Sequence, residues 1–546
     1  MENNKSVTGA NQSGNMYSYQ EEQKVPVVET GAIRRSLGEG NPNAISDYQL
    51  NNINNSSINQ ERVNNQNSMV IQVNQNPPLI WMFFLIFGII QIIIIILIAN
   101  YYNWDVSNNP INSKETEFNL ISGWEIDIKY KLFQDINIMI FLGFGFLRSF
   151  LKHHSWTSIA LTFIGGVLSF EFGLFILICW GGIFKPGWSP GLFNFGHFLD
   201  SNYCSAAIVI SLGAVLGKIS LSQYIFMILF ETIFSTFNYV LLRQKLRIID
   251  VGGALTIHLF GSIFGAIFSL ISFGSKNERE RIKKSIHFGS NYNSNIFALF
   301  GTLILITYWP SFNTSLVNDD EYKFQGVINT YLAILGSIVG TFCISPICNL
   351  GKIKIKDILN SSFSGAIIVA GCCHIIEHLW VSILSGVIGG GLTTYLCNII
   401  SDRLKRKGFH DTSDIIYYHG IPGFLGGIIT TIYVGNQNQT QNKEDLYQLI
   451  GTIMNYSETI DENNNSINIP DYAGKHFGSI FLTIVIALSS GFVAGFAIKF
   501  CNCNIALRYF NDSEFFDVSE NEPFPWEDEQ VQLQVHYISG SRNQNN

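Results

Sequence analysis

The stretch LIWMFFLIFGIIQIIIIILIAN, residues 79–100, decides the class of fold, because its 22 residues include no charged side chain. About 20 apolar residues let one helix cross a bilayer. Similar apolar runs are centred near residues 143, 168, 210, 232, 262, 302, 336, 368, 390, 426 and 488. Only 14% of the 546 residues are charged, whereas soluble chains carry about 25%. We therefore predict an all-α membrane protein with about twelve transmembrane helices.

Composition divides the chain into three parts. Residues 1–76 are polar, rich in Asn, Gln and Ser, and lack the apolar core of a signal peptide, so we expect a disordered cytoplasmic tail. Residues 77–505 hold all the apolar runs and form the expected transmembrane domain. Residues 506–546 form an acidic cytoplasmic tail, which we expect to be solvated and disordered.

Lysine and arginine in the short loops predict which side of the membrane each loop faces, because they favour the cytoplasmic side. With the N-terminus inside and twelve spans, four basic clusters fall inside and both termini are cytoplasmic. These clusters are Arg148 with Lys152, Lys276–Lys284, Lys352–Lys356 and Arg403–Lys407. The connection with Arg243, Lys245 and Arg247 falls outside and breaks the pattern. We expect a multi-pass protein of the plasma membrane or of a vacuolar or endosomal membrane.

The loop of residues 435–474 would then be extracellular. It contains glycosylation sequons at Asn438, Asn455 and Asn464, although such triplets arise often by chance in a chain rich in asparagine. The nine cysteines are scattered, mostly within apolar runs, which argues against a disulfide framework or a zinc site.

Ionisable residues inside apolar spans are costly and need a reason. Asp250 precedes His258 by eight residues, and Asp411 precedes His419 by the same number. On a helix that spacing means about 12 Å of rise and a net rotation of roughly 80°, so each pair could face one channel. A glycine also follows each histidine at an offset of seven. The match suggests an internal repeat, with the histidines meeting near the membrane midplane.

Two neutral imidazoles in an apolar pore can hydrogen-bond a small neutral polar molecule, because each offers one donor and one acceptor nitrogen. Ammonia fits that description, whereas ammonium would bring its desolvation cost into the pore. The structural alternatives are that a lone histidine satisfies a buried carbonyl and that Asp250 braces the adjacent glycine-containing turn. For Asp250 bracing is the better interpretation.

Five segments resemble the Rh glycoproteins of the ammonium transporter superfamily. They are QDINIMIFLGFGFLRSFLK from Gln134, NYCSAAIVISLGAVLGK from Asn202, DVGGALTIHLFG from Asp250, YWPSFN from Tyr308 and HDTSDIIYYHGIPG from His410. The resemblance covers residues 76–505. It implies a ten-helix inverted-repeat core with an extra N-terminal helix. It also implies assembly as a homotrimer or an Rh heterotrimer with one pore per subunit.

The same resemblance assigns expected roles to single residues. His258 and His419 match the twin histidines of the pore, and Asp250 matches the buried aspartate. Phe312 matches one phenylalanine that narrows the pore, and Tyr203 stands at the other. The hydroxyl of Tyr203 could contact the permeant or a water molecule.

Three vestibule positions depart from the family pattern. Asn202 and Asn295 stand where the family usually has aspartates, and Tyr239 stands where Rh glycoproteins commonly have glutamate. Each departure removes a negative charge. We therefore expect weaker recruitment of ammonium by Coulomb attraction. The alternative is that these are neutral substitutions at solvated positions, without effect on transport.

The leading hypothesis is passive, electroneutral net transport of ammonia across the bilayer. A carbon dioxide pathway and a non-conducting membrane scaffold are the alternatives. We expect no enzyme activity, cofactor or metal, because no metal triad, phosphate loop or nucleophile elbow occurs in a loop of sufficient size. A net charge of -8 and membrane burial argue against nucleic acid as a partner.

Overall fold

The structure is a computed structural model. It describes residues 77–101, 103–104, 121–184, 192–193, 195–274, 289–317, 319–436 and 469–500, together with Asp512 and Phe516. The expected tail of residues 1–76, most of residues 506–546 and the three sequons lie outside the described residues.

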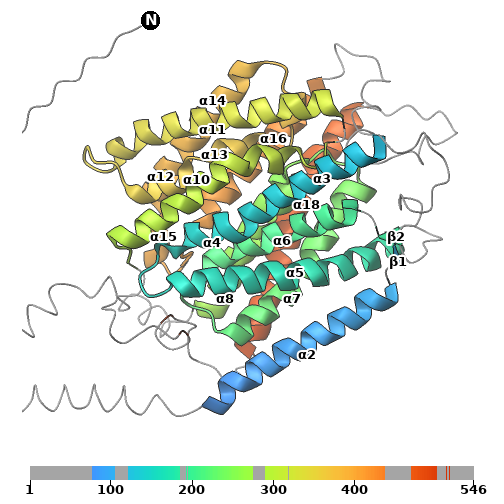
Figure 1. Cartoon of the computed structure of the whole chain (residues 1–546). Helices are drawn as coiled ribbons and strands as arrows, with labels where there is room; N and C mark the ends of the chain where they lie inside the picture. The colour runs from blue at the N-terminus through green and yellow to red at the C-terminus, as the bar shows by residue number, and fades with distance from the viewer. Residues whose placement is uncertain are drawn as a thin grey trace, which may run out of the picture. The chain divides into compact units, whose positions relative to one another are not determined.

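Helices account for nearly all of the described residues (Figure 1). The long ones are α2 (Pro77–Tyr101), α5 (Ser155–Phe184), α6 (Phe195–Val215), α7 (Leu221–Val240), α10 (Tyr292–Thr314), α11 (Asp320–Cys348), α14 (Leu379–Leu396) and α18 (Ile469–Phe500). The shorter ones are α3 (Ile121–Asn137), α4 (Phe144–Leu147), α8 (Phe260–Phe273), α12 (Ile355–Ser361), α13 (Ser364–Val369), α15 (Asp402–Arg406) and α16 (Ile421–Asn436). A two-residue strand, β1 (Asn103–Trp104), pairs in parallel with β2 (Leu192–Phe193).

Tighter and wider helical turns interrupt or begin several of these helices. The π-helical turns are η3 (Ile138–Gly143), η5 (Leu241–Lys245), η6 (Ala254–Leu259), η9 (Cys397–Ser401) and η10 (Ile416–Gly420). The 3-10 turns are η4 (Arg148–Phe150) and η8 (Cys373–Ile375). Turns of the π type are rare and often occur at functional sites.

Eight helical segments within the described residues are long and apolar enough to cross a membrane. Further helices lie at the other expected centres, namely α2, α3 with α4, α12 with α13, and η10 with α16. The prediction of an all-α protein with several membrane spans is confirmed. The count of twelve spans and the inverted repeat stay predictions.

Burial distinguishes inner helices from outer ones. The span that includes α6 is 89% buried, whereas the spans of α10 and α11 are each 39% buried. Large apolar side chains such as Phe300, Phe324 and Tyr331 are exposed on these outer helices. Apolar outer surfaces of this kind suit contact with lipid or with another membrane-spanning chain.

Glycines let α11 and α14 pack against each other at backbone distance. A Cβ atom on Gly336 would lie 2.2 Å from the carbonyl oxygen of Ile383, and one on Gly390 would lie 2.0 Å from that of Ser337. No side chain fits at those distances, so only glycine permits this crossing. Small residues serve the same purpose at other helix interfaces in membranes.

Candidate functional site

Each of the two intramembrane histidines lies in a π-helical turn that begins a helix. His258 lies in η6, which continues into α8, and His419 lies in η10, which continues into α16. The expectation that Asp250 shares a continuous helix with His258 is wrong, because the helix begins only at Ala254. The residue before it, Gly253, has φ of +72°, a left-handed conformation that glycine adopts without strain.

Asp250 binds the first turn of the helix that carries His258. One of its carboxylate oxygens accepts hydrogen bonds from the backbone N–H of Leu255 at 3.2 Å and of Thr256 at 2.9 Å, and from Oγ1 of Thr256 at 2.8 Å. The two backbone N–H groups belong to the first turn of the helix, where no carbonyl of the same helix can accept from them, and a carboxylate is a favourable partner there. The geometry is that of a brace for η6.

The two histidines lie side by side and are buried. Nδ1 of His258 and Nδ1 of His419 are 3.3 Å apart, and the ring planes are inclined by only 13° with centroids 5.4 Å apart. Two nitrogens at that distance form a hydrogen bond when one carries a proton and the other does not. The opposite nitrogen of His258, Nε2, is buried and has no hydrogen-bond partner among the described residues. It is therefore free to bind a small polar molecule.

Aromatic rings surround the histidine pair. Trp309 stacks on His258 at 5.7 Å between centroids and on Phe363 at 4.9 Å. Phe363 in turn lies 5.8 Å from His419, and Phe144 approaches His419 at 6.1 Å. This apolar wall disfavours charge on either imidazole and suits neutral molecules.

A stacked pair of rings closes one side of this region. Tyr203 and Phe312 are 4.8 Å apart with an interplanar angle of 8°, and Phe312 lies 6.4 Å from His258. The hydroxyl of Tyr203 donates to the carbonyl oxygen of Phe312 and lies 2.8 Å from Oγ of Ser315. The tyrosine hydroxyl is thus used for structure.

A polar cluster lies around the start of α6 and the end of α7. The hydroxyl of Tyr239 donates to Asp200, and Nη1 of Arg243 donates to that hydroxyl at 2.9 Å. Asn202, two residues after Asp200, is also buried, and its side-chain amide nitrogen has no hydrogen-bond partner among the described residues. Sequence reasoning missed Asp200, which supplies a carboxylate next to Tyr239. It also counted Arg243 as a loop charge, although the side chain is buried.

Asn295 does not join this cluster. It lies on the first turn of α10, whereas Phe312 lies on the last, which separates them by about 25 Å along the helix. Its neighbour Ser294 donates to the carbonyl oxygen of Phe150, at the other side of the histidine pair. The three predicted vestibule positions therefore divide between two regions.

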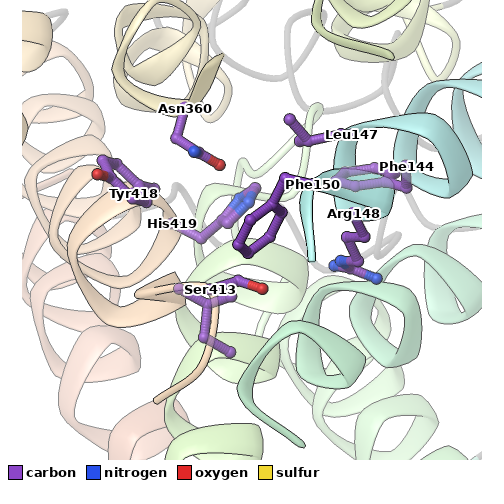
Figure 2. A pocket seen from close by; sticks show the side chains of 9 residues that line it. Phe144, Leu147, Arg148, Phe150, Asn360, Ser413, Tyr418 and His419 are labelled. Carbon is purple, nitrogen blue, oxygen red and sulfur yellow. The ribbon is translucent and has the colours of Figure 1, made fainter. Parts of the chain in front are cut away.

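A small cavity lies against His419 (Figure 2). It has room for about one water molecule, because the centre of such a molecule can occupy a volume of about 10 Å³. Its lining consists of Phe144, Leu147, Arg148, Phe150, Asn360, Ser413, Ile415, Tyr418 and His419. Arg148 was expected as a loop charge, but the side chain is only 3% exposed.

Charged groups hold the segment that leads into η10. Nζ of Lys356 and Nζ of Lys405 both bind the carboxylate of Asp414, the latter at 2.8 Å. Burial alone would raise the pKa of Asp414, but the two ammonium groups outweigh it and keep its pKa below the usual range. The charged carboxylate is therefore favoured, and it anchors the chain five residues before His419.

Lys218, in the loop that joins α6 to α7, is a second buried charge. Nζ of Lys218 donates to the carbonyl oxygen of His410 at 2.6 Å and to Oγ of Ser269 at 2.7 Å. Burial lowers the pKa of Lys218 to about 7 and that of His410 to about 3. Within the described ranges no group of three His, Cys, Asp or Glu side chains could hold a metal ion.

Comparison with known proteins places these features in a family. The sequence profile of the Ammonium Transporter Family matches residues 122–521. The chain is 31% identical over 448 residues to the ammonium transporter Rh type C-like 2 of Danio rerio, which covers 79% of this chain and 87% of that protein. It is 33% identical over 358 residues to Rhesus-like glycoprotein A of Dictyostelium discoideum, covering 63% of this chain and 67% of the relative.

Solved structures agree with this at the level of the fold. A channel of the Rhesus protein family from Nitrosomonas europaea superposes with a TM-score of 0.61 at 24% identity, covering 77% of this chain and all of that one. The family profile spans most of the chain, and the similar proteins are of the Rh type. The chain therefore belongs to the ammonium transporter family and, within it, to the Rh proteins.

Proposed function

We propose that the chain conducts ammonia passively and without net charge through a pore that passes the pair His258 and His419. The observation that carries this proposal is the pair itself, buried between aromatic rings, with Nε2 of His258 unpartnered among the described residues. A neutral molecule with one lone pair and three donors can bind such nitrogens. Ammonium would have to lose its hydration in the same apolar surroundings.

The path that we propose follows the rings in order. A permeant would pass the stacked Tyr203 and Phe312, then His258 and His419, and leave through the cavity beyond His419. Ammonium would lose its proton before the rings and ammonia would regain one after the cavity. Asp250 would act by holding η6, because its oxygens are engaged by the helix start.

The supporting assembly is part of the proposal. We propose twelve spans, a ten-helix inverted-repeat core with an extra N-terminal helix, and a homotrimer or Rh heterotrimer with one pore per subunit. The matched histidine turns at η6 and η10 and the apolar outer faces of α10 and α11 support it. Mass measurement of the detergent-solubilised complex tests the trimer.

Topology and location complete the proposal. Both termini would be cytoplasmic, with residues 1–76 and 506–546 as tails of the transmembrane domain at 77–505, in the plasma membrane or a vacuolar or endosomal membrane. The loop around Asn438, Asn455 and Asn464 would face outward or into the lumen. A mobility shift on endoglycosidase treatment that disappears when the three asparagines are replaced tests this orientation.

Flux through proteoliposomes tests the function. We expect His258→Ala and His419→Ala each to lower ammonia flux at least about tenfold, because either change leaves the other imidazole without its partner. His476→Gln is the matched control. That histidine is also buried, and its Nε2 accepts from the backbone N–H of Ile249 at 2.9 Å, an interaction that glutamine can replace. Unchanged flux in both alanine variants would refute the proposed path.

Charge movement tests electroneutrality in the same vesicles. Ammonium gradients should produce ammonia flux without a sustained transport current, and a current proportional to flux would contradict neutral passage. A carbon dioxide pathway is the second candidate, favoured by the apolar rings between Tyr203 and His419. This pathway would be selected if carbon dioxide acidified the vesicle interior faster than the lipid alone allows, while ammonium salts gave no flux above that of the lipid. A chain that passes neither gas would be a scaffold.

A further inference from the structure

Arg148 is a buried cation without an ion-pair partner among the described residues. Its Nη2 donates to the carbonyl oxygen of Ile210 at 3.2 Å, and its guanidinium lies 5.2 Å from the ring centre of Phe144. Its Nη1 has no partner, and no carboxylate in the described part of the chain lies within 4 Å. A buried cation left uncompensated is costly, so this arrangement calls for a counter-ion.

A second unpartnered donor lines the same cavity. Oγ of Ser413 is buried and makes no hydrogen bond within the described residues. Figure 2 shows Arg148 and Ser413 facing the cavity next to His419. Gly213 of α6 lies against both residues and against Ile415. A Cβ atom there would lie 2.6 Å from Cγ2 of Ile415, 3.3 Å from Cβ of Ser413 and 3.4 Å from Nε of Arg148.

We propose that this cavity is a binding site for a small monovalent anion of about the size of chloride, held by Nη1 of Arg148 and Oγ of Ser413. A guanidinium offers only donors and a hydroxyl can donate, so both can point at one anion. Room for about one water molecule excludes a large organic anion. The net positive charge of the lining excludes a metal cation.

Asp411 is the acidic group that competes for Arg148. Its Oδ2 accepts from the backbone N–H of Ile416 at 3.1 Å, and its Oδ1 has no partner among the described residues. It lies beyond ion-pair distance from Arg148. Burial, assisted by the charge of Asp414, raises the pKa of Asp411, which weakens it as a counter-ion. If a water molecule bridged Arg148 and Asp411, the cavity would bind no anion, and the experiment below separates the two cases.

Occupancy of the site would affect transport, an effect that rests on the proposed function. The proposed path leaves through the cavity that Arg148 and His419 line, and this cavity has room for about one water molecule. A bound chloride would fill that space and hinder ammonia from leaving. We therefore expect ammonia flux to fall several-fold when chloride replaces gluconate at constant ionic strength on the side of the cavity.

Chloride-35 line broadening with the purified full-length chain in detergent tests the site directly. We expect excess line width that saturates with chloride and falls at least about fivefold in Arg148→Met, since the charged donor contributes most of the binding. Ser413→Ala should weaken binding while Arg148 remains. Lys152→Met is the matched control, because it removes a positive charge four residues away and outside the cavity lining, and it should leave the broadening unchanged.

The outcomes are separable. Broadening that persists in Arg148→Met, or that falls equally in Lys152→Met, would overturn the anion site. If Arg148→Met does not fold, loss of broadening in Ser413→Ala still supports the site and full retention there opposes it. Bicarbonate that removes the chloride signal would identify it as a competing occupant. Because binding is measured without flux, a failure of the histidine variants to alter transport would leave this result intact.

Discussion

Replacing Asp414 by asparagine isolates the contribution of the charge that anchors the histidine-bearing turn. Asp414 has φ of +59°, a left-handed conformation that asparagine tolerates better than other side chains. The substitution therefore keeps the backbone and removes only the negative charge. Its partners are Lys356 of α12, Lys405 of α15 and the hydroxyl of Ser401.

The size of the effect follows from burial. Breaking a fully buried pair by removing one partner costs about 3–5 kcal/mol. Here the side chains of Lys356 and Lys405 are 25% and 24% exposed, so both ammonium groups can turn toward solvent and recover part of that loss. We expect Asp414→Asn to lower the free energy of unfolding by roughly 2–3 kcal/mol at pH 7.5. Lys405→Met should cost less, because Lys356 still pairs with the carboxylate.

Unfolding of the full-length chain in mixed micelles with increasing SDS measures this free energy. Since the pKa of Asp414 is depressed in the folded chain, its stabilisation is present above its unfolded pKa of about 3.9 and is lost as the pH falls below that value. The difference between the two proteins should shrink on acidification below about pH 4. A loss under about 0.5 kcal/mol at pH 7.5, within the usual range for surface changes, would refute the reasoning, as would a difference that grows in acid.

Three further changes have defined outcomes. Tyr203→Phe removes the hydroxyl contact with Ser315 but keeps the ring stack, so it should lower the free energy of unfolding by about 1 kcal/mol. Ammonia flux should be unchanged, and a loss of flux would assign the hydroxyl a role in conduction. Gly390→Ala should reduce the yield of folded protein on size-exclusion chromatography, because its Cβ would lie 2.0 Å from a carbonyl oxygen of α11. Gly391→Ala is the control, because its Cβ would meet nothing nearer than a side-chain atom at 3.3 Å, and equal yields of the two variants would contradict the reasoning. Burial lowers the pKa of Lys218 to about 7, so the unfolded chain binds more protons between about pH 7 and 10 and stability rises with pH there. Lys218→Met should flatten that rise, and an unchanged slope would disprove it.

Periodicity and composition were sufficient for the class of fold, because uncharged apolar runs of bilayer length seldom occur outside membrane-spanning chains. The spacing of aspartate and histidine likewise singled out the two residues that the structure brings to 3.3 Å. The helix geometry assumed for that spacing was wrong. Gly253 turns the chain left-handed after Asp250, and a π turn follows, and neither feature has a periodic signature.

The charges near the histidines were harder to predict, because burial depends on neighbours far away in the chain. Arg148 and Arg243 stand at the ends of apolar runs, where loop charges are common, yet both are buried. Asp200 gave no signal, since its contact with Tyr239 joins residues 39 positions apart. Only the departures of Asn202 and Tyr239 from the family pattern pointed toward that cluster.

The contact between the two Nδ1 atoms has a consequence for symmetry. When both rings are neutral and share one proton between the two Nδ1 atoms, one imidazole is the donor and the other must carry its own proton on Nε2. The two turns are matched, but the hydrogen bond between their histidines then runs from one ring to the other. To reverse it, both rings must exchange tautomers. At any instant the two rings therefore differ in which nitrogen offers a lone pair and which offers a proton to a small molecule bound beside them.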